Sequence, residues 1–266
     1  MLSVRVVKLG GNELERPDWL AACAQALASA GPIVVVHGGG RAVTALSQQL
    51  GLPVEKRAGI RVTTPEVAAV VEMVLGGPIN RNVVGALRLA GLDAVGLSGV
   101  DGGLLTAELL PGGFGHVGKI TAVRVALLHS LLLAGLTPVI APMAPGSGGD
   151  VGSGGGGGGG GADVPFNVNA DDAAAAIAGA LQAAELLFIS DVPGVVVEGV
   201  PQPTLPVGAL DTLIELGIAA DGMAAKLRAA AAALEAGTRA VRIGDLRLLG
   251  DPTAGTRLLA ATVQPA

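Results

Sequence analysis

The chain has 266 residues, of which 50% are hydrophobic and only 2% aromatic, and its formal net charge is −5. This length suffices for one large domain or two small ones, with a core built mainly from Leu, Val, Ile and Ala. The negative charge argues against a nucleic-acid partner, because such a partner requires a basic surface.

The single cysteine, Cys23, cannot form an internal disulfide, which favours a reducing compartment such as the cytoplasm. Cys23 falls in a helical stretch, where we expect a small core residue. The chain does not open with a charged region and a long apolar run, so we expect no signal peptide. No apolar stretch is long enough to span a membrane without a Gly or Pro interruption, so we expect no membrane partner.

Strand-like runs of β-branched residues alternate with helical segments along the chain. This alternation predicts an α/β fold with a largely parallel sheet and antiparallel insertions. The predicted core strands span residues 4–9, 33–36, 93–97, 137–141, 185–189 and 240–243, and a last short strand follows residues 255–257. The predicted helices span residues 18–30, 41–50, 65–75, 78–90, 125–134, 171–181, 206–216 and 221–236. Hairpins are predicted at residues 53–63 and 104–125.

The first predicted strand ends in Lys8-Leu9-Gly10-Gly11-Asn12. Glycines directly after a strand let the backbone approach a ligand and present N–H groups to an anion. Lys8 lies inside an apolar run, where a lysine is costly unless it meets an opposite charge. A strand-end lysine that reaches solvent is the alternative interpretation.

A second glycine turn, His37-Gly38-Gly39-Gly40, joins the second strand to a helix. Such a turn forms an anion site through free N–H groups and the helix dipole. Neither turn carries G-x-G-x-x-G, which argues against an oxidoreductase with a Rossmann fold. We expect His37 to hold the turn through a backbone hydrogen bond and not to act as a base.

Arg61 lies on the returning strand of the first hairpin, between Ile60 and Val62. An arginine in this position is well placed to hold a carboxylate through two parallel hydrogen bonds. A solvent-facing strand arginine explains the same pattern equally well.

Asn167, Asn169 and Asp171 alternate between a short apolar segment and an alanine-rich helix. Each suits a helix start, where a side-chain oxygen accepts hydrogen bonds from free N–H groups, so a cap alone explains them. The cluster also lies between a strand and a helix, where α/β folds bind ligands. Lys226 lies near the start of another helix, a poor place for a cation unless an anion binds there, although a surface lysine is the alternative. We therefore predict one site from this cluster, the two glycine turns and residues 221–227.

Residues 146–161 are mostly glycine, with eight in succession at 154–161. This composition predicts a flexible linker. The run of eight has no lysine or hydroxyl group, so we do not expect it to bind phosphate.

The chain resembles the amino acid kinase family in a set of segments that keep the family's order and roughly its spacing. These segments are VVKLGG, VVVHGGG, AGIRVT, GHVG, NVNAD, LFISDVPGV, DGM with Lys226 three residues on, and a terminal GTR. Together they cover the chain apart from the glycine run. The resemblance implies a three-layer αβα sandwich with a central, mainly parallel sheet. It also implies a single domain, 1–266, with an acid-binding lobe at about 1–165 and an ATP-binding lobe at about 166–266.

Within the family, the similarity is greatest to the members that phosphorylate the side-chain carboxylate of N-acetyl-L-glutamate in arginine biosynthesis. It implies ATP as phosphoryl donor, with Mg²⁺ carried by the ATP phosphates and no metal held by the protein. Lys8 and Lys226 would neutralise the phosphoryl group in transfer, and Asp171 would hold both lysines. The residues implied to bind the acid are Gly39, Gly40, Arg61, Asn167 and Asn169. The residues implied to bind ATP are Gly10, Gly11, Asp191, Val192, Gly194, Gly222 and Met223.

The chain departs from the family pattern in three places, one of which is the glycine-rich segment before NVNAD. The common G-M-I-P-K is here Gly222-Met223-Ala224-Ala225-Lys226, and the usual asparagine-lysine pair is Asn80-Arg81. Arginine-inhibited members carry an extra N-terminal helix that joins dimers into a ring, whereas this chain's first strand starts near residue 1. We therefore expect a homodimer that arginine does not inhibit.

Two other functions stay open within this fold. A related kinase would act on carrier-bound aminoadipate, but the segment AGIRVT resembles that branch less. A non-catalytic nucleotide-binding regulator would be free to lose a lysine, whereas Lys8, Asp171 and Lys226 are all present.

Overall fold

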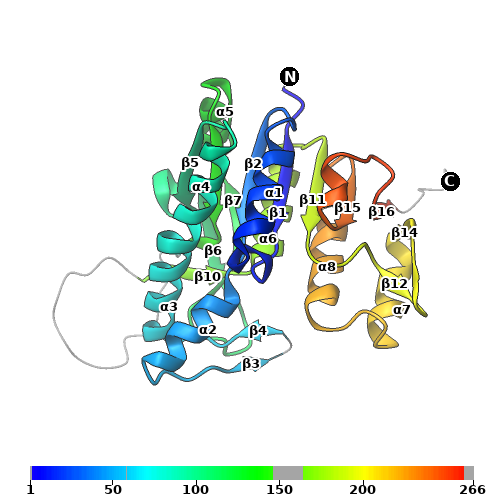
Figure 1. Ribbon diagram of the computed structural model, residues 1–266. Coiled ribbons are helices and arrows are strands. Elements are labelled where there is room, and N and C mark those ends of the chain that lie inside the picture. Colours follow the sequence, from blue (N-terminus) through cyan, green and yellow to red (C-terminus); the bar gives the residue numbers. More distant parts are fainter. Residues whose placement is uncertain (1, 58, 146–163, 261–266) are drawn as a thin grey trace.

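An eight-stranded sheet forms the centre of the computed structural model, which describes residues 2–57, 59–145 and 164–260 (Figure 1). The glycine run that predicts a linker lies outside these residues. The strand order is β14-β16-β15-β11-β1-β2-β8-β5. The strands are β1 (Arg5–Leu9), β2 (Ile33–His37), β5 (Ala94–Ser98), β8 (Thr137–Ala141), β11 (Glu185–Ile189), β14 (Thr204–Pro206), β15 (Val241–Gly244) and β16 (Thr256–Leu259).

Neighbouring strands of this sheet run parallel, except that β15 and β16 pair antiparallel. The mainly parallel sheet that the sequence predicts is therefore confirmed, as are its six core strands. Strand β1 lies between β2 and β11, with Lys8 in register with Val36 on one side and Phe188 on the other.

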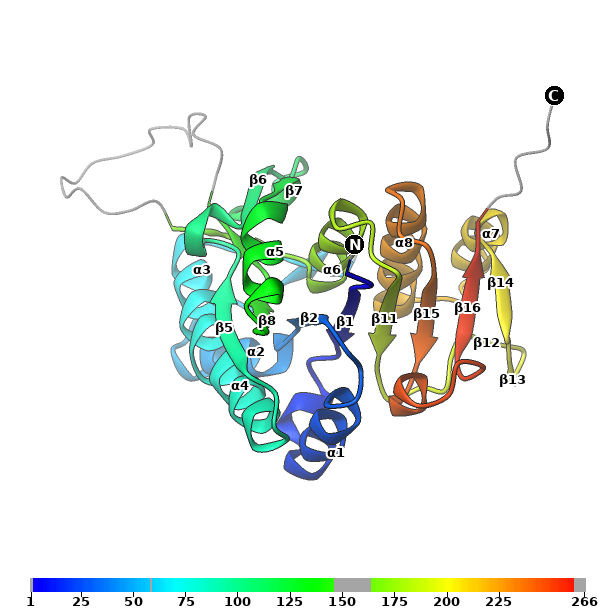
Figure 2. The same ribbon diagram turned by 90° about the horizontal axis from the view of Figure 1, so that it is seen from above.

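Helices cover both faces of the sheet, as Figure 2 shows from above. Successive residues of a strand point to opposite faces, so Val6 packs into one core and Val7 into the other. The Val7 core contains residues of α1 (Pro17–Leu27), α2 (Gly40–Gln49), α3 (Pro65–Val71) and α4 (Asn80–Leu89). The Val6 core contains residues of α5 (Val125–Leu133), α6 (Ala170–Ala180), α7 (Leu210–Glu215) and α8 (Asp221–Glu235). The predicted three-layer αβα sandwich is confirmed.

Helices α3 and α4 form one kinked rod instead of two separate helices. The π-helical segment η2 (Glu72–Ile79) joins them, and its kink falls at Gly77, where φ is −97° and ψ is −112°. By length and composition alone, residues 65–89 pass as a membrane span, but half of the apolar window is buried inside the fold. Core helices pass the same test, and the rod supplies Val67, Val74 and Val83 to the Val7 core.

Smaller sheets and short helices surround this sandwich. The predicted hairpins are present, as β3 (Lys56–Arg57) with β4 (Ile60–Arg61) and as β6 (Leu105–Leu109) with β7 (Val117–Val123). Strands β9 (Met143–Ala144) and β10 (Phe166–Val168) extend the second hairpin to four strands, and β12 (Val196–Val197) pairs with β13 (Val200–Pro201). The 3₁₀ segments are η1 (Glu13–Glu15), η3 (Asp101–Gly103), η4 (Val207–Ala209) and η5 (Leu246–Leu249).

The helix predicted at residues 206–216 is wrong at its first residue. Residues 204–206 pair with β16 as the edge strand β14, and the 3₁₀ segment η4 then leads into α7, which begins at Leu210. The pairing with β16 involves residues about 50 positions away, which local sequence does not reveal.

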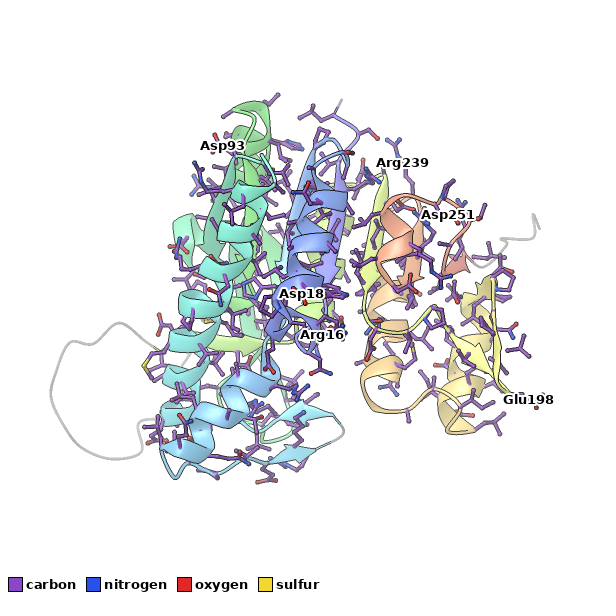
Figure 3. All side chains as sticks on the ribbon, viewed as in Figure 1. Arg16, Asp18, Asp93, Glu198, Arg239 and Asp251 are labelled. Carbon is purple, nitrogen blue, oxygen red and sulfur yellow. The ribbon has the colours of Figure 1, made fainter. Side chains whose placement is uncertain are left out.

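Charged side chains lie mostly on the surface (Figure 3). Arg16, Asp18, Asp93, Glu198, Arg239 and Asp251 are all exposed. Among the side chains that the structure describes, the buried charged ones are Lys8, Glu13, Arg61, Asp171, Lys226 and Arg242.

A buried charge is costly unless it is paired, so each of these six requires a reason. Arg242 on β15 is paired internally: its Nε lies 2.6 Å from Glu185 Oε1, and its Nη2 donates to the Leu248 carbonyl. The other five line a single cavity.

Candidate active site

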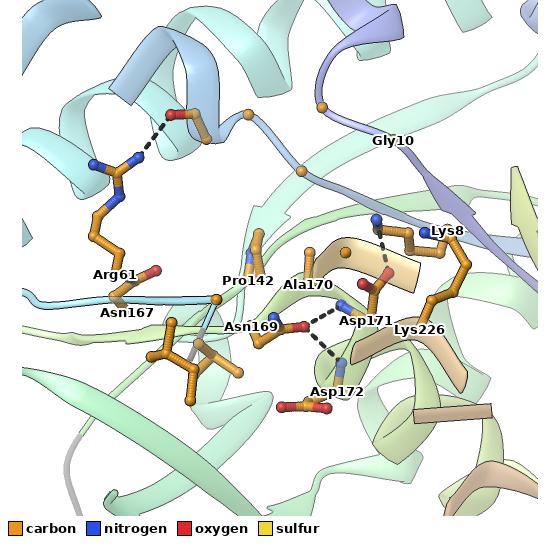
Figure 4. A pocket seen from close by; sticks show the side chains of 18 of the residues that line it. Lys8, Gly10, Arg61, Pro142, Asn167, Asn169, Ala170, Asp171, Asp172 and Lys226 are labelled. Atoms are coloured by element: carbon orange, nitrogen blue, oxygen red, sulfur yellow. Dashed lines mark hydrogen bonds and ion pairs between the residues drawn. The ribbon is translucent and has the colours of Figure 1, made fainter. Parts of the chain in front are cut away.

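The cavity, about 1220 Å³ in volume, lies at the carboxyl ends of β1, β2 and β11 (Figure 4). The first part of the chain adds strands to the sheet on the β2 side of β1, and the second part adds them on the β11 side. In open α/β sheets, ligands bind at such a point, where the strand order reverses. All four lysines of the sequence line this cavity: Lys8, Lys56, Lys119 and Lys226.

The structure brings together every predicted site residue except Gly194. The cavity lining includes Lys8, Gly10, Gly11, Gly39, Gly40, Arg61, Asn167, Asn169, Asp171, Asp191, Val192, Gly222, Met223 and Lys226. Gly194 instead packs against strand β16. A Cβ at Gly194 would lie 2.6 Å from Thr256 Oγ1, and Val195 N–H donates to the same oxygen at 2.8 Å.

An ion pair forms the inner wall of the cavity. Lys8 Nζ lies 2.7 Å from Asp171 Oδ1, and the two side chains are 9% and 10% exposed. Burial raises the pKa of Asp171, but Lys8 and Lys226 outweigh this effect, so that the net pKa of the carboxyl is lowered. The carboxylate is therefore ionised at neutral pH.

The start of helix α6 positions this carboxylate. Asn169 caps the helix, and its Oδ1 accepts hydrogen bonds from the N–H groups of Asp171 at 2.8 Å and of Asp172 at 3.2 Å. The predicted cap is thus confirmed at Asn169, and Asp171 occupies the first turn, where the helix dipole favours a negative charge.

Lys226 extends into the same wall from the second turn of α8. Its pKa is lowered by burial and by Lys8, while Asp171, Glu13 and Asp191 act in the opposite direction. The buried charges of the cavity are three cations, Lys8, Arg61 and Lys226, against two carboxylates, Glu13 and Asp171. This excess of positive charge suits an anionic ligand. Among the described residues, no cluster of three or more His, Cys, Asp or Glu side chains is arranged to hold a metal ion.

The two glycine turns meet back to back at the cavity floor. Gly10 N–H donates to the Ile189 carbonyl and Gly38 N–H to the Leu9 carbonyl. A Cβ at Gly11 would lie 2.5 Å from the Gly39 nitrogen, so any larger residue would force the turns apart. Helix α2 begins at Gly40, and the N–H groups of a first helical turn have no partner within the helix. The turns therefore offer an anion site next to the lysines.

Arg61 lies at the opposite end of the cavity and is 8% exposed. Its Nη2 donates to the Gly40 carbonyl and to Thr44 Oγ1, both at 2.7 Å. Its Nη1 is buried and has no partner among the described residues. A buried donor without a partner costs free energy, so the Arg61 guanidinium keeps an unmet hydrogen-bond donor.

Asn167 lies beside Arg61 (Figure 4), and the hydrogen bonds of Thr63 link the two residues. Asn167 Nδ2 donates to Thr63 Oγ1 at 3.2 Å, and that hydroxyl donates to the Arg61 carbonyl at 3.0 Å. The amide of Asn167 is therefore oriented by the segment directly after β4, the strand that carries Arg61.

Several cavity residues were missed by sequence reasoning. Glu13 is 4% exposed, and a Cβ at Gly10 would meet its Oε2 at 2.0 Å. Ser190 has a buried hydroxyl without a partner among the described residues. Asp172 is a partly solvent-accessible residue of the cavity lining, and desolvation, followed by the charge of Asp171, raises its pKa to about 6. Only Ser190 had a usable sequence signal, because it directly precedes Asp191 at the end of a predicted strand.

His37 has the structural role that the sequence predicts. It is fully buried, its Nδ1 donates to the Gly38 carbonyl at 2.9 Å, and its Nε2 accepts from Asn80 Nδ2 at 3.1 Å. Burial lowers the pKa of His37 to about 4, although the bond to Gly38 partly opposes this. The ring is neutral and holds the second glycine turn. Cys23 is a buried core residue of α1, as predicted.

Comparisons with known proteins agree with this architecture. The sequence profile of the amino acid kinase family matches residues 3–245. The acetylglutamate kinase of Chloroflexus aurantiacus is 44% identical over 261 residues, which are 97% of each chain. The solved structure of smu.665 from Streptococcus mutans has a TM-score of 0.82 at 27% identity, covering 98% of this chain and 100% of that one. Carbamate kinase from Giardia lamblia bound to AMP-PNP has a TM-score of 0.70 at 15% identity, covering 97% and 99%.

An α/β sandwich with two buried lysines and two glycine turns at one sheet edge is built to bind phosphates. The chain belongs to the amino acid kinase family, and it is a kinase.

Proposed function

We propose that this enzyme transfers the γ-phosphoryl group of ATP to the side-chain carboxylate of N-acetyl-L-glutamate, a step of arginine biosynthesis. The observation that carries the proposal is the cavity itself, which has the buried Lys8–Asp171–Lys226 cluster at one end and the half-satisfied guanidinium of Arg61 at the other. The relative from C. aurantiacus, with 44% identity, is named for this activity.

The charges of the cavity suit the chemistry of the reaction. The nucleophile is a carboxylate with a pKa near 4.3 in solution, so it is already ionised at neutral pH and needs no general base. A neutral, structural His37 is consistent with this. Catalysis then depends on bringing two anions together and neutralising the phosphoryl group during transfer. Lys8 and Lys226 would supply that neutralisation, and Asp171 would hold the two ammonium groups at the correct distance.

The acid would bind at the Arg61 end. Nη1 of Arg61 would donate to its α-carboxylate, and the amides of Asn167 and Asn169 would bind its remaining polar groups. The backbone at Gly39 and Gly40 would complete this half of the site. These residues come from the first lobe, about 1–165, and from the start of the second.

ATP would bind at the other end, against Gly10, Gly11, Asp191, Val192, Gly222 and Met223. The relative from G. lamblia binds an ATP analogue on the same fold. Mg²⁺ would accompany the ATP phosphates and add positive charge at the phosphoryl group. Gly194 would act indirectly, because its contact with Thr256 shapes the loop that carries Asp191 and Val192.

We also propose that the enzyme is a cytoplasmic homodimer. Exposed Met73 and Leu89, 54% and 89% accessible on the α3–α4 rod, are consistent with a homodimer. A molar mass of two chains in sedimentation equilibrium would support it, and a monomer or hexamer would oppose it. A single buried cysteine is compatible with the cytoplasm.

The function is tested by measuring ADP release from Mg-ATP with a panel of acids. The panel contains N-acetyl-L-glutamate, L-glutamate, L-aspartate, N-acetyl-L-aspartate and N-acetyl-L-2-aminoadipate. We expect turnover to require the acetylated five-carbon acid. Preference for aminoadipate would favour the related kinase, and ATP binding without turnover on any acid would favour a regulator.

A further inference from the structure

Thr44 lies one helical turn after Gly40 on α2, on the face that meets Arg61. Its hydroxyl donates to the Gly40 carbonyl at 2.9 Å and accepts from Arg61 Nη2 at 2.7 Å. A threonine hydroxyl has a single hydrogen. Because the Gly40 carbonyl takes that hydrogen, the oxygen presents only lone pairs to the guanidinium.

The two hydrogens of Arg61 Nη2 are thereby both used. One goes to the Gly40 carbonyl and the other to Thr44 Oγ1, each at 2.7 Å. A guanidinium is planar, so fixing one end fixes the direction of the other. Nη1 is left shielded from solvent and without a partner among the described residues, on a side chain that lines the cavity.

We propose that Thr44 is a positioning residue that sets which nitrogen of Arg61 faces the substrate, and so determines selectivity for an acid with an α-carboxylate. The inference rests on the proposed function. Without the hydroxyl, Nη2 keeps only the Gly40 carbonyl, and the guanidinium is free to rotate about its stem. An arginine with several orientations binds a carboxylate less tightly, because binding must then order it.

The test compares two substrates that differ at one group. N-acetyl-L-glutamate carries the α-carboxylate, whereas 4-acetamidobutanoate keeps the acetamide and the reacting carboxylate but lacks it. Thr44→Val removes the hydroxyl with little change in volume or helix propensity. Thr44→Ser keeps the hydroxyl. Thr121→Val is the matched control, because that exposed strand threonine donates to the Thr106 carbonyl and neither residue lines the cavity.

We expect Thr44→Val to lower kcat/KM for N-acetyl-L-glutamate roughly tenfold through KM, the size of a lost hydrogen bond to a charged group. With 4-acetamidobutanoate, the same variant should stay within about twofold of the wild type, as should KM for Mg-ATP, because neither involves Arg61 Nη1. Thr44→Ser should restore most of the affinity, and Thr121→Val should match the wild type. If turnover of 4-acetamidobutanoate is too slow, its inhibition constant against N-acetyl-L-glutamate provides the comparison.

Equal losses on both substrates would overturn the inference, since they would mean that Thr44 supports the fold or the site in general. Unchanged kinetics in Thr44→Val would overturn it as well. A wild-type enzyme inactive on N-acetyl-L-glutamate would instead remove the proposed function, and the inference with it.

Discussion

Lys8 Nζ and Asp171 Oδ1 lie 2.7 Å apart and join the central strand β1 to the first turn of α6, across most of the sequence. Both side chains are about nine-tenths buried. Either charge, buried here without the other, would destabilise the folded protein. The pair therefore matters both for the stability of the fold and for the proposed chemistry.

The ion pair predicts a specific pattern of stabilities. Lys8→Met or Asp171→Leu should lower the free energy of unfolding by on the order of 3 kcal/mol, because each leaves a buried charge without its partner. Asp171→Leu should be the worse of the two, since it leaves both Lys8 and Lys226 unpaired. The double variant should be more stable than Asp171→Leu alone. Urea unfolding at neutral pH measures all three.

An exposed ion pair provides the control. Arg88 Nη1 lies 2.7 Å from Asp93 Oδ1, but these side chains are 60% and 64% exposed. Asp93→Ala should change stability by no more than about 0.5 kcal/mol, because water screens the pair. If Asp93→Ala lowers the free energy of unfolding as much as Lys8→Met or Asp171→Leu does, the Lys8–Asp171 pair is not shielded from water.

Removing either lysine should damage turnover more than binding. Lys8→Met or Lys226→Met should lower kcat roughly 10²–10³-fold, the usual effect of losing one electrostatic donor to a transition state. Affinity for the acid should change little, since we propose that the acid binds at the Arg61 end. The exposed Arg88→Met controls for the loss of a positive charge. Near-normal kcat in either lysine variant would remove that lysine from the phosphoryl-transfer site.

Arg61→Ala should act on the acid and not on ATP. A charged hydrogen bond contributes about 1.5–3 kcal/mol, so KM for N-acetyl-L-glutamate should rise roughly 10- to 150-fold. KM for Mg-ATP should stay close to that of the wild type. Steady-state kinetics of the variant and the wild type measure both KM values, and the prediction is that only the one for N-acetyl-L-glutamate changes. If both rise together, Arg61 stabilises the whole cavity and does not bind the acid selectively.

The sequence predicted the parts of the fold that local pattern controls. The largely apolar runs at residues 33–36 and 185–189 are typical of buried strands. The glycine turns that follow two of the strands must then lie at one sheet edge once the sheet is parallel. The convergence of Lys8, Asp171 and Lys226 followed from their positions at strand and helix ends.

What the sequence did not predict depends on contacts distant along the chain. Residues 204–206 became a strand only because β16 lies beside them. Thr44 and Glu13 look like ordinary helix residues until Arg61 and Gly10 are placed against them. Gly194 lies within a segment that the family resemblance assigns to ATP binding. Its requirement for glycine comes instead from Thr256, whose Oγ1 leaves no room for a Cβ at residue 194.

His37 predicts a loss of stability in mild acid. Its pKa is about 4 in the folded protein, against about 6.5 in an unfolded chain. The unfolded state therefore binds more protons as pH falls through 6.5, and the contribution of the neutral ring, complete above pH 6.5, is lost progressively down to pH 4. The loss by pH 4 is on the order of 3 kcal/mol.

Urea unfolding of the wild type and of His37→Gln between pH 7.5 and 4.5 isolates this contribution. The wild type should lose more stability than the variant over that range. If the variant does not fold, the ring signals of His37 in the wild type answer the same question by NMR. A His37 midpoint near pH 6.5, or parallel stability profiles, would contradict a buried neutral ring.

Trapping the product tests the central claim most directly. The wild-type enzyme is incubated with Mg-ATP, N-acetyl-L-glutamate and hydroxylamine, which converts an acyl phosphate to a hydroxamate. The account predicts one N-acetylglutamyl hydroxamate per ADP, with the new group on the side-chain carboxyl by mass spectrometry. ADP without hydroxamate would contradict it, because no acyl phosphate would then have formed. A hydroxamate on the α-carboxyl would also contradict it, because Arg61 would then not be holding the α-carboxylate away from the phosphoryl group.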